Sequence, residues 1–111
     1  MRERNHKVYF KDILDSIENI EKYIKDLSFD EFSNNKMVVD AVIRNFEIIG
    51  EASKNIPDDV KVLYKNIPWK EMAGMRDKVI HEYFGIDLDI VWKTAKTRLL
   101  NIADSLKSIL L

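Results

Sequence analysis

Residues 10–27 read FKDILDSIENIEKYIKDL, and this stretch indicates the class of fold. Its apolar side chains recur at alternating steps of three and four residues: Phe10, Ile13, Ile17, Ile20, Ile24 and Leu27. That spacing places them along one side of an α-helix that packs against neighbouring helices. No glycine precedes Gly50 and no proline precedes Pro57, so nothing interrupts this helix.

The C-terminal segment has the same pattern and contains no glycine or proline after Gly85. Its apolar residues step by four and three: Leu88, Trp92, Ala95, Leu99, Ile102, Leu106 and Ile109. We expect a single amphipathic helix here, with Asp87 as its N-terminal cap.

A further helix is predicted over residues 36–55, where the apolar face is broader. This face consists of Val38, Val39, Val42, Phe46, Ile49, Ala52 and Ile56. A helix that is apolar over so wide an arc usually contacts two neighbours, or one neighbour and a second subunit. Pro57 closes this helix.

Short helical segments are predicted on either side of residues 36–55. Ser28 and Glu31 have the spacing of a capping box, which starts a helical turn. Asp58 or Asp59 can cap a short helix that runs to about Tyr64.

The remaining long helix is predicted between Pro68, which suits a first helical turn, and Gly85, which suits a helix end. Its inner face consists of Met72, Met75 and Val79. The sequence therefore predicts an all-α protein: an antiparallel four-helix bundle with a short extra helix, forming one domain over residues 1–111.

Composition excludes several classes of site. The chain has no cysteine, so it holds no disulfide, thiol nucleophile or cysteine-bound zinc. It has no long apolar run that would span a membrane or form a signal peptide, so we expect a cytoplasmic protein without membrane contact. The net charge of −1 means that any site for a polyanion must be local.

Residues 75–85, MRDKVIHEYFG, hold the side chains best suited to chemistry. Arg76 can bind phosphate, His81 can transfer protons near neutral pH, and Tyr83 adds a phenol. A metal-free ribonuclease needs the first two roles, because a base or acid must act while a cation neutralises charge on the phosphorus oxygens.

The spacing of Arg76 and His81 counts against the simplest version of this site. Positions five apart lie about 140° apart around an ideal helix. Two arrangements would still bring both side chains to one phosphate. Either the helix unwinds before Gly85, or two subunits related by a two-fold axis each contribute residues to the site. Alternatively, His81 is a helix-end residue and Arg76 a surface ion-pair partner.

Other candidate sites are weaker. His6 is expected in a solvated N-terminal tail, and Glu47 with Glu51 form either an acidic face or a carboxylate opposite Arg76. No zinc-protease helix, phosphate-binding glycine loop or nucleophile elbow occurs, so no metal or cofactor is predicted. Gly74, like Gly50, falls inside a predicted helix, either as a tolerated cost or for close approach of a backbone or ligand.

The string from Arg76 to Tyr83 resembles the Arg-x-x-x-x-His-x-Tyr motif of the HEPN superfamily, and specifically of its HepT-type toxins. Asp77 matches the polar residue that follows the arginine there. Four further segments match in order: Ile49-Gly50-Glu51-Ala52, Ile67-Pro68-Trp69, Tyr83-Phe84-Gly85-Ile86-Asp87 and Val91-Trp92. The resemblance covers residues 35–95.

This resemblance implies an all-helical, metal-independent RNA endonuclease that dimerises with its motif helices facing each other. Arg76 and His81 would be the catalytic pair, contributed by both subunits, with Asp77 as an orienting residue. The protein would be the toxin of a type VII toxin–antitoxin system. A cognate MntA-like nucleotidyltransferase antitoxin would neutralise it by adding AMP to Tyr83, because the adenylate repels and obstructs substrate phosphate.

Two other functions remain open. The chain could be a non-catalytic partner of a nucleotidyltransferase, binding nucleotide or acting as a scaffold, or a purely structural dimerisation bundle. The intact Arg76 and His81 favour the enzyme. A local basic strip could attract RNA, or be ordinary solvated side chains: Lys70, Arg76, Lys78, Lys93 and Lys96.

Overall fold

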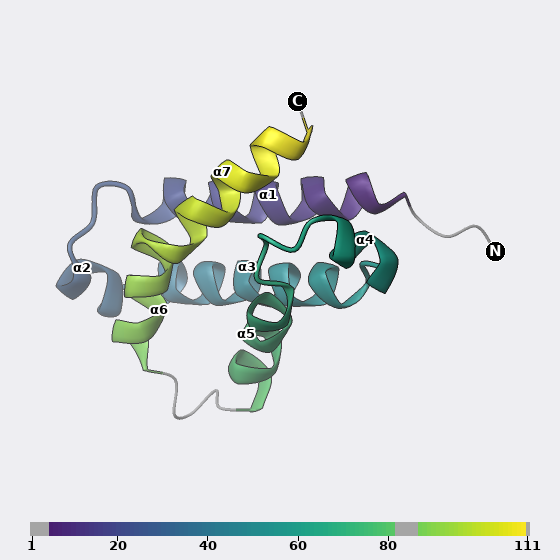
Figure 1. The fold of residues 1–111 in the computed structure, drawn as a ribbon. Coiled ribbons are helices and arrows are strands. Elements are labelled where there is room, and N and C mark those ends of the chain that lie inside the picture. Colours follow the sequence, from purple (N-terminus) through teal and green to yellow (C-terminus); the bar gives the residue numbers. More distant parts are fainter. Residues whose placement is uncertain (1–4, 82–86, 111) are drawn as a thin grey trace.

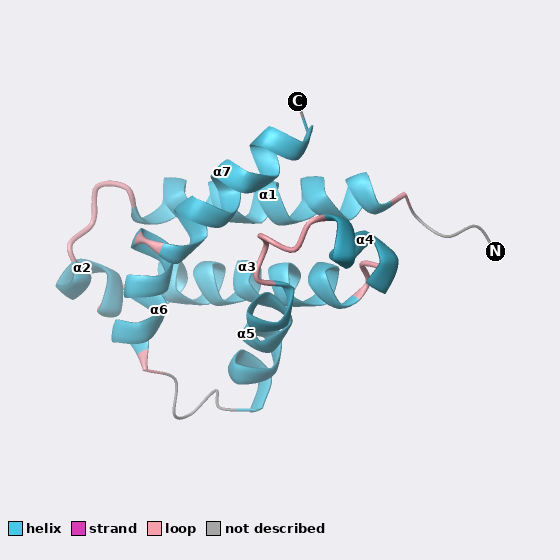
Figure 2. Ribbon diagram, in the orientation of Figure 1, coloured by secondary structure: helices cyan, strands magenta, loops and turns pink. Residues whose placement is uncertain are grey.

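The structure is a computed structural model that describes residues 5–81 and 87–110, with the backbone alone over residues 76–81. Its regular elements are α1 (His6–Ile24), α2 (Phe29–Ser33), α3 (Lys36–Lys54), α4 (Asp58–Leu63), α5 (Trp69–His81), α6 (Leu88–Lys96) and α7 (Arg98–Leu110). All regular structure in the described ranges is helical (Figure 2), which confirms the predicted all-α class.

The bundle is built around α1 and α3, which pack side by side and run in opposite directions (Figure 1). α5 packs on α3, and α7 packs on α1. The predicted stripe of α1 lies in the core, because Phe10, Ile13, Ile17 and Ile20 are fully buried. This burial is what holds the helices together, at about 25 cal/mol per Å² of apolar surface.

Local hydrogen bonds set where several helices begin. The backbone N–H of Glu31 donates to Ser28 Oγ (3.1 Å), and that of Ser28 donates to Glu31 Oε1 (3.0 Å). The predicted capping box is therefore present at α2. Asp87 caps α6 as predicted, because its Oδ1 accepts the backbone N–H of Asp89 at 3.0 Å.

The prediction of a single helix over residues 88–109 is wrong, because the segment breaks at Thr97 into α6 and α7. Thr97 leaves the helical backbone region, with φ −128° and ψ −69°. Its Oγ1 donates at 2.7 Å to the carbonyl of Lys93, which also accepts the backbone N–H of Thr97 at 3.1 Å. Such bonds from threonine to the carbonyl four residues earlier often bend helices. The apolar stripe still continues across the break, because Ala95 and Leu99 are both buried.

The expected cap of α4 is also wrong. Asp58 and Asp59 lie within the first turn of the helix, and Pro57 occupies the cap position without a side-chain hydrogen bond. Both carboxylates still favour the helix, because negative charge near a helix N-terminus interacts well with its dipole.

An aromatic cluster anchors the start of α5. The Trp69 ring stacks on Phe10 of α1, with centroids 5.5 Å apart, and Trp69 Nε1 donates to the carbonyl of Tyr64 at 3.1 Å. Pro68 directly precedes the helix, and its carbonyl accepts the backbone N–H of Met72 at 3.0 Å. The proline–tryptophan pair thus fixes the entry of α5 into the bundle.

None of the helices in the described part of the chain is long and apolar enough to cross a membrane.

Candidate functional site

Arg76, Asp77 and His81 lie on α5, and His81 is its last residue. The backbone is α-helical from Arg76 to His81, so the helix does not unwind between them. The two positions therefore lie about 140° apart around the helix axis. The side chains of these three residues, and the whole of Tyr83 and Gly85, lie outside the described residues.

The first half of α5 is packed and the second half projects. Trp69 and Met72 are buried. Figure 1 shows α5 crossing α3, with its carboxyl end extending beyond it towards the level where α6 begins. The fold thus holds the predicted catalytic positions at the projecting end of a well-anchored helix.

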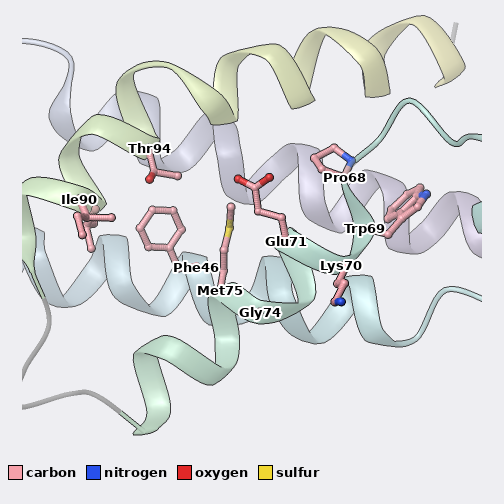
Figure 3. A pocket seen from close by; sticks show the side chains of 10 residues that line it. Phe46, Pro68, Trp69, Lys70, Glu71, Gly74, Met75, Ile90 and Thr94 are labelled. Atoms are coloured by element: carbon pink, nitrogen blue, oxygen red, sulfur yellow. The ribbon is translucent and has the colours of Figure 1, made fainter.

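A groove of about 820 Å³ separates α5 from α6 (Figure 3). Its lining residues are Phe46, Pro68, Trp69, Lys70, Glu71, Gly74, Met75, Ile90, Val91 and Thr94. Most of these side chains are apolar, and Ile90 is 52% exposed although it is a large aliphatic residue. Apolar walls suit a protein surface better than the phosphates of a nucleic acid, which are bound by cations and N–H donors.

Gly74 lies in the α5 wall of this groove. A Cβ atom at this position would have no atom of the described structure within 4 Å other than those of its chain neighbours and its own helix backbone. Packing within the described chain therefore does not require a glycine here, although glycine costs about 1 kcal/mol relative to alanine inside a helix. Both interpretations left open by the sequence, a tolerated cost and the close approach of a backbone or ligand, are compatible with this open space.

An ion pair between α5 and α7 was not predicted from the sequence. Arg98 Nε donates to Glu71 Oε1 at 3.0 Å, and Arg98 Nη2 donates to Glu71 Oε2 at 2.7 Å. Hydrogen bonding to Glu71 and the negative charge of its carboxylate raise the pKa of Arg98 above its usual value. The two residues are 27 apart in sequence, so no helical spacing could have indicated the pair.

Two lysines of the predicted basic strip, Lys93 and Lys96, have local partners. Lys93 pairs with Asp89 at 2.8 Å, and the hydrogen bond and charge of Asp89 raise the pKa of Lys93. The Lys96 Nζ lies 4.7 Å from the centroid of the Trp92 ring. These contacts favour the interpretation of these two lysines as ordinary surface residues.

The remaining candidates have structural partners. Glu47 pairs with Arg44 on its own helix, with 3.5 Å between Arg44 Nη1 and Glu47 Oε2. His6 is the first residue of α1 rather than part of a tail, and its ring lies edge-on to Phe10 at 5.5 Å. The described residues contain no group of three His, Cys, Asp or Glu side chains that could hold a metal ion.

The sequence is similar to proteins named as ribonucleases over most of its length. The family model described as "Ribonuclease HepT-like" matches residues 13–109. A protein named "Probable ribonuclease HepT" from Thermococcus cleftensis is 55% identical over 93 residues, 84% of each chain. No solved structure matches the chain significantly.

Two further relatives are named provisionally as RNases. One, from Methanocaldococcus jannaschii, is 46% identical over 110 residues, which cover 99% of this chain and 95% of the relative. The other, from Caldanaerobacter subterraneus, is 40% identical over 102 residues, 92% and 91% of the two chains. The family match and these relatives span nearly the whole sequence, including the helix that carries Arg76 and His81, so the chain belongs to the ribonuclease HepT-like family.

Proposed function

We propose that the chain is a metal-independent RNA endonuclease in which Arg76 and His81 are the catalytic residues. The family match over residues 13–109 carries this proposal. The position of both residues on one helix, α5, that is anchored at Trp69 and projects at its carboxyl end supports it.

The chemistry needs these residue types and solvent water. His81 makes one of the two proton transfers, either taking the proton from the ribose 2′-OH or giving one to the leaving 5′-oxygen, and water makes the other. The 2′-oxygen forms a bond to phosphorus and the bond to the 5′-oxygen breaks, which leaves a cyclic phosphate and a free 5′-hydroxyl. Arg76 stabilises the charge that builds on the phosphorus oxygens, and Asp77 orients the pair. DNA lacks the 2′-OH and is not a substrate.

We also infer that two copies associate with their α5 helices facing each other. The helical backbone between Arg76 and His81 supports this, because one subunit presents positions about 140° apart to a single phosphate. The apolar groove beside α5, the exposed Ile90 and the open space at Gly74 support a protein surface at this place.

The family resemblance further suggests regulation by a partner. The protein would act as the toxin of a type VII toxin–antitoxin system, inhibited when an MntA-like nucleotidyltransferase adds AMP to Tyr83. Tyr83 is two residues from His81 in sequence, so an adenylate there would bring negative charge next to the catalytic helix.

The test is cleavage of RNA by the purified chain in the presence of EDTA. We expect cleavage by the wild type and at least a hundredfold loss in both Arg76→Ala and His81→Ala, because each removes one essential role. His6→Ala and Arg44→Ala are matched controls, which remove the other histidine and an exposed arginine of α3 and should retain activity.

Cleavage of DNA at a comparable rate, or full activity of His81→Ala, would contradict the proposed chemistry. If unmodified wild type and both variants are equally inactive, with intact mass confirming that Tyr83 is unmodified, the chain is instead a non-catalytic partner of a nucleotidyltransferase. Binding of that partner would then be measured directly.

A further inference from the structure

The two helices that flank residues 82–86 are attached to different parts of the bundle. α5, which carries Arg76 and His81, packs mainly on α3, whereas α6 packs on α1 and α2 and continues into α7. The groove lies between α5 and α6 (Figure 3). The angle between α5 and the C-terminal arm, α6 with α7, is therefore not set by a tightly packed α5–α6 interface.

The Glu71–Arg98 ion pair connects α5 directly to the C-terminal arm. Glu71 lies in the first turn of α5, and Arg98 is the first residue of α7, directly after the break at Thr97. Arg98 contacts both carboxylate oxygens, with N–O distances of 3.0, 3.2 and 2.7 Å. A planar guanidinium that binds both oxygens restricts orientation as well as distance, which a lysine would not do.

Exposure argues that this pair does more for orientation than for stability. The side chains of Arg98 and Glu71 are 50% and 46% exposed. Half-exposed pairs contribute little to folding, so a role in stability alone does not explain a bidentate contact between distant elements. The pair is well placed to restrict the tilt of α5 relative to the C-terminal arm.

We propose that Glu71 and Arg98 are positioning residues that set the tilt of α5 relative to the C-terminal arm, and thereby the placement of Arg76 and His81. His81 is ten residues beyond Glu71, or about 15 Å along the helix, so a tilt of about 4° displaces it by about 1 Å. A misplacement of about 1 Å can cost about a hundredfold in rate. The activity readout of this proposal rests on the proposed ribonuclease function.

A charge reversal tests the pair. Glu71→Arg and Arg98→Glu should each lower kcat about tenfold or more with KM nearly unchanged, because substrate contacts remain while catalytic alignment is lost. The double variant E71R/R98E restores an ion pair with reversed direction and should recover most of kcat. Thermal unfolding should change little in all three.

The Lys11–Asp15 pair provides a matched control. It is also exposed, at 64% and 51%, but lies within α1 alone. Lys11→Glu changes the net charge by the same amount as Arg98→Glu, so it separates a charge effect on RNA binding from loss of alignment. Lys11→Glu should leave kcat unchanged. If either single reversal unfolds the chain, Glu71→Gln replaces it, since the amide keeps the size of the side chain.

A spectroscopic readout separates this proposal from the ribonuclease function. The chain has no cysteine, so spin labels can be attached at Lys78→Cys on α5 and Lys93→Cys on α6. With labelled chains diluted in unlabelled ones, the wild type should give one narrow distance distribution. Glu71→Gln and Arg98→Glu should broaden it, and E71R/R98E should narrow it again.

Each outcome is decisive. Unchanged distances in Arg98→Glu, or a double variant no more active than the singles, would overturn the positioning role. If the wild type does not cleave RNA but Glu71→Gln and Arg98→Glu broaden the distance distribution, the positioning role of the pair is supported and the proposed ribonuclease function is not.

Discussion

At the scale of single residues, Gly74 is the position where the stability of the helix and the proposed association of two copies favour different residues. It lies in the middle of α5, where glycine is unfavourable, and its side faces open space in the groove. A helix that keeps a glycine at such a point leaves room for another backbone to approach closely. Trp69, at the start of α5, differs from Gly74 because its contacts lie within the chain. Its ring stacks on Phe10, and its Nε1–H donates to the carbonyl of Tyr64.

Gly74→Ala should therefore have two effects of opposite sign. The free energy of unfolding of the single chain should rise by about 1 kcal/mol, because alanine favours the helix and meets no described atom. Association of two copies should weaken, because the added methyl group occupies the approach. Denaturant titration and sedimentation equilibrium measure the two quantities separately. An unchanged dimer affinity would mean that the second copy does not approach at Gly74.

At the scale of elements, the start of α6 matters because α6 follows residues 82–86 and forms one wall of the groove. Asp87 accepts the backbone N–H groups of Asp89 and Ile90, at 3.0 and 3.4 Å. These bonds satisfy donors that the first turn of a helix leaves unpaired. The cap thus holds the end of the C-terminal arm that is nearest in sequence to the predicted catalytic residues.

Asp87→Ala should lower the free energy of unfolding by about 1 kcal/mol, as expected for loss of an N-cap. Asp58→Ala is the matched control, because Asp58 begins α4 without acting as its cap. It should cost only a few tenths of that, since it changes only an interaction with the helix dipole. Urea unfolding of both variants gives the comparison. Equal losses of unfolding free energy would show that the hydrogen bonds of Asp87 add no stability beyond the interaction of its carboxylate charge with the helix dipole.

The break between α6 and α7 also belongs to this scale. The apolar stripe runs through both helices, and its period alone predicts one continuous helix. The chain leaves the helical conformation at Thr97, whose Oγ1 donates to the carbonyl of Lys93, and the next residue, Arg98, pairs with Glu71. A threonine in a helical pattern is too common a feature to predict a break by itself.

At the scale of the whole molecule, we propose that two chains share each site. The groove and the helical positions of Arg76 and His81 support a site that one subunit does not complete. Two such copies related by a two-fold axis would each contribute one residue to each site.

Mixing two inactive variants tests this arrangement. After exchange of subunits, half of the dimers formed by Arg76→Ala and His81→Ala chains are mixed, and each mixed dimer has one intact site of two. Activity should therefore recover to about a quarter of the wild-type value. Mixing each variant with itself is the control. No recovery, with subunit exchange shown independently, would place Arg76 and His81 of one chain in the same site.

The sequence by itself determined the helical class, the extent of α3, the caps at Ser28 and Asp87 and the helix that carries Arg76 and His81. These depend on periodicity and on interactions between residues a few positions apart, which the order of residues displays directly. The family resemblance was also readable from short motifs.

Only the tertiary structure decided the break at Thr97, the groove between α5 and α6, the open space beside Gly74 and the Glu71–Arg98 pair. Each depends on how helices distant in sequence pack. Glu71 and Arg98 illustrate the reason, because residues 27 apart meet only when α3 and α1 hold their helices in place. Local spacing predicts which face of a helix is buried, but not which distant side chain will lie opposite it.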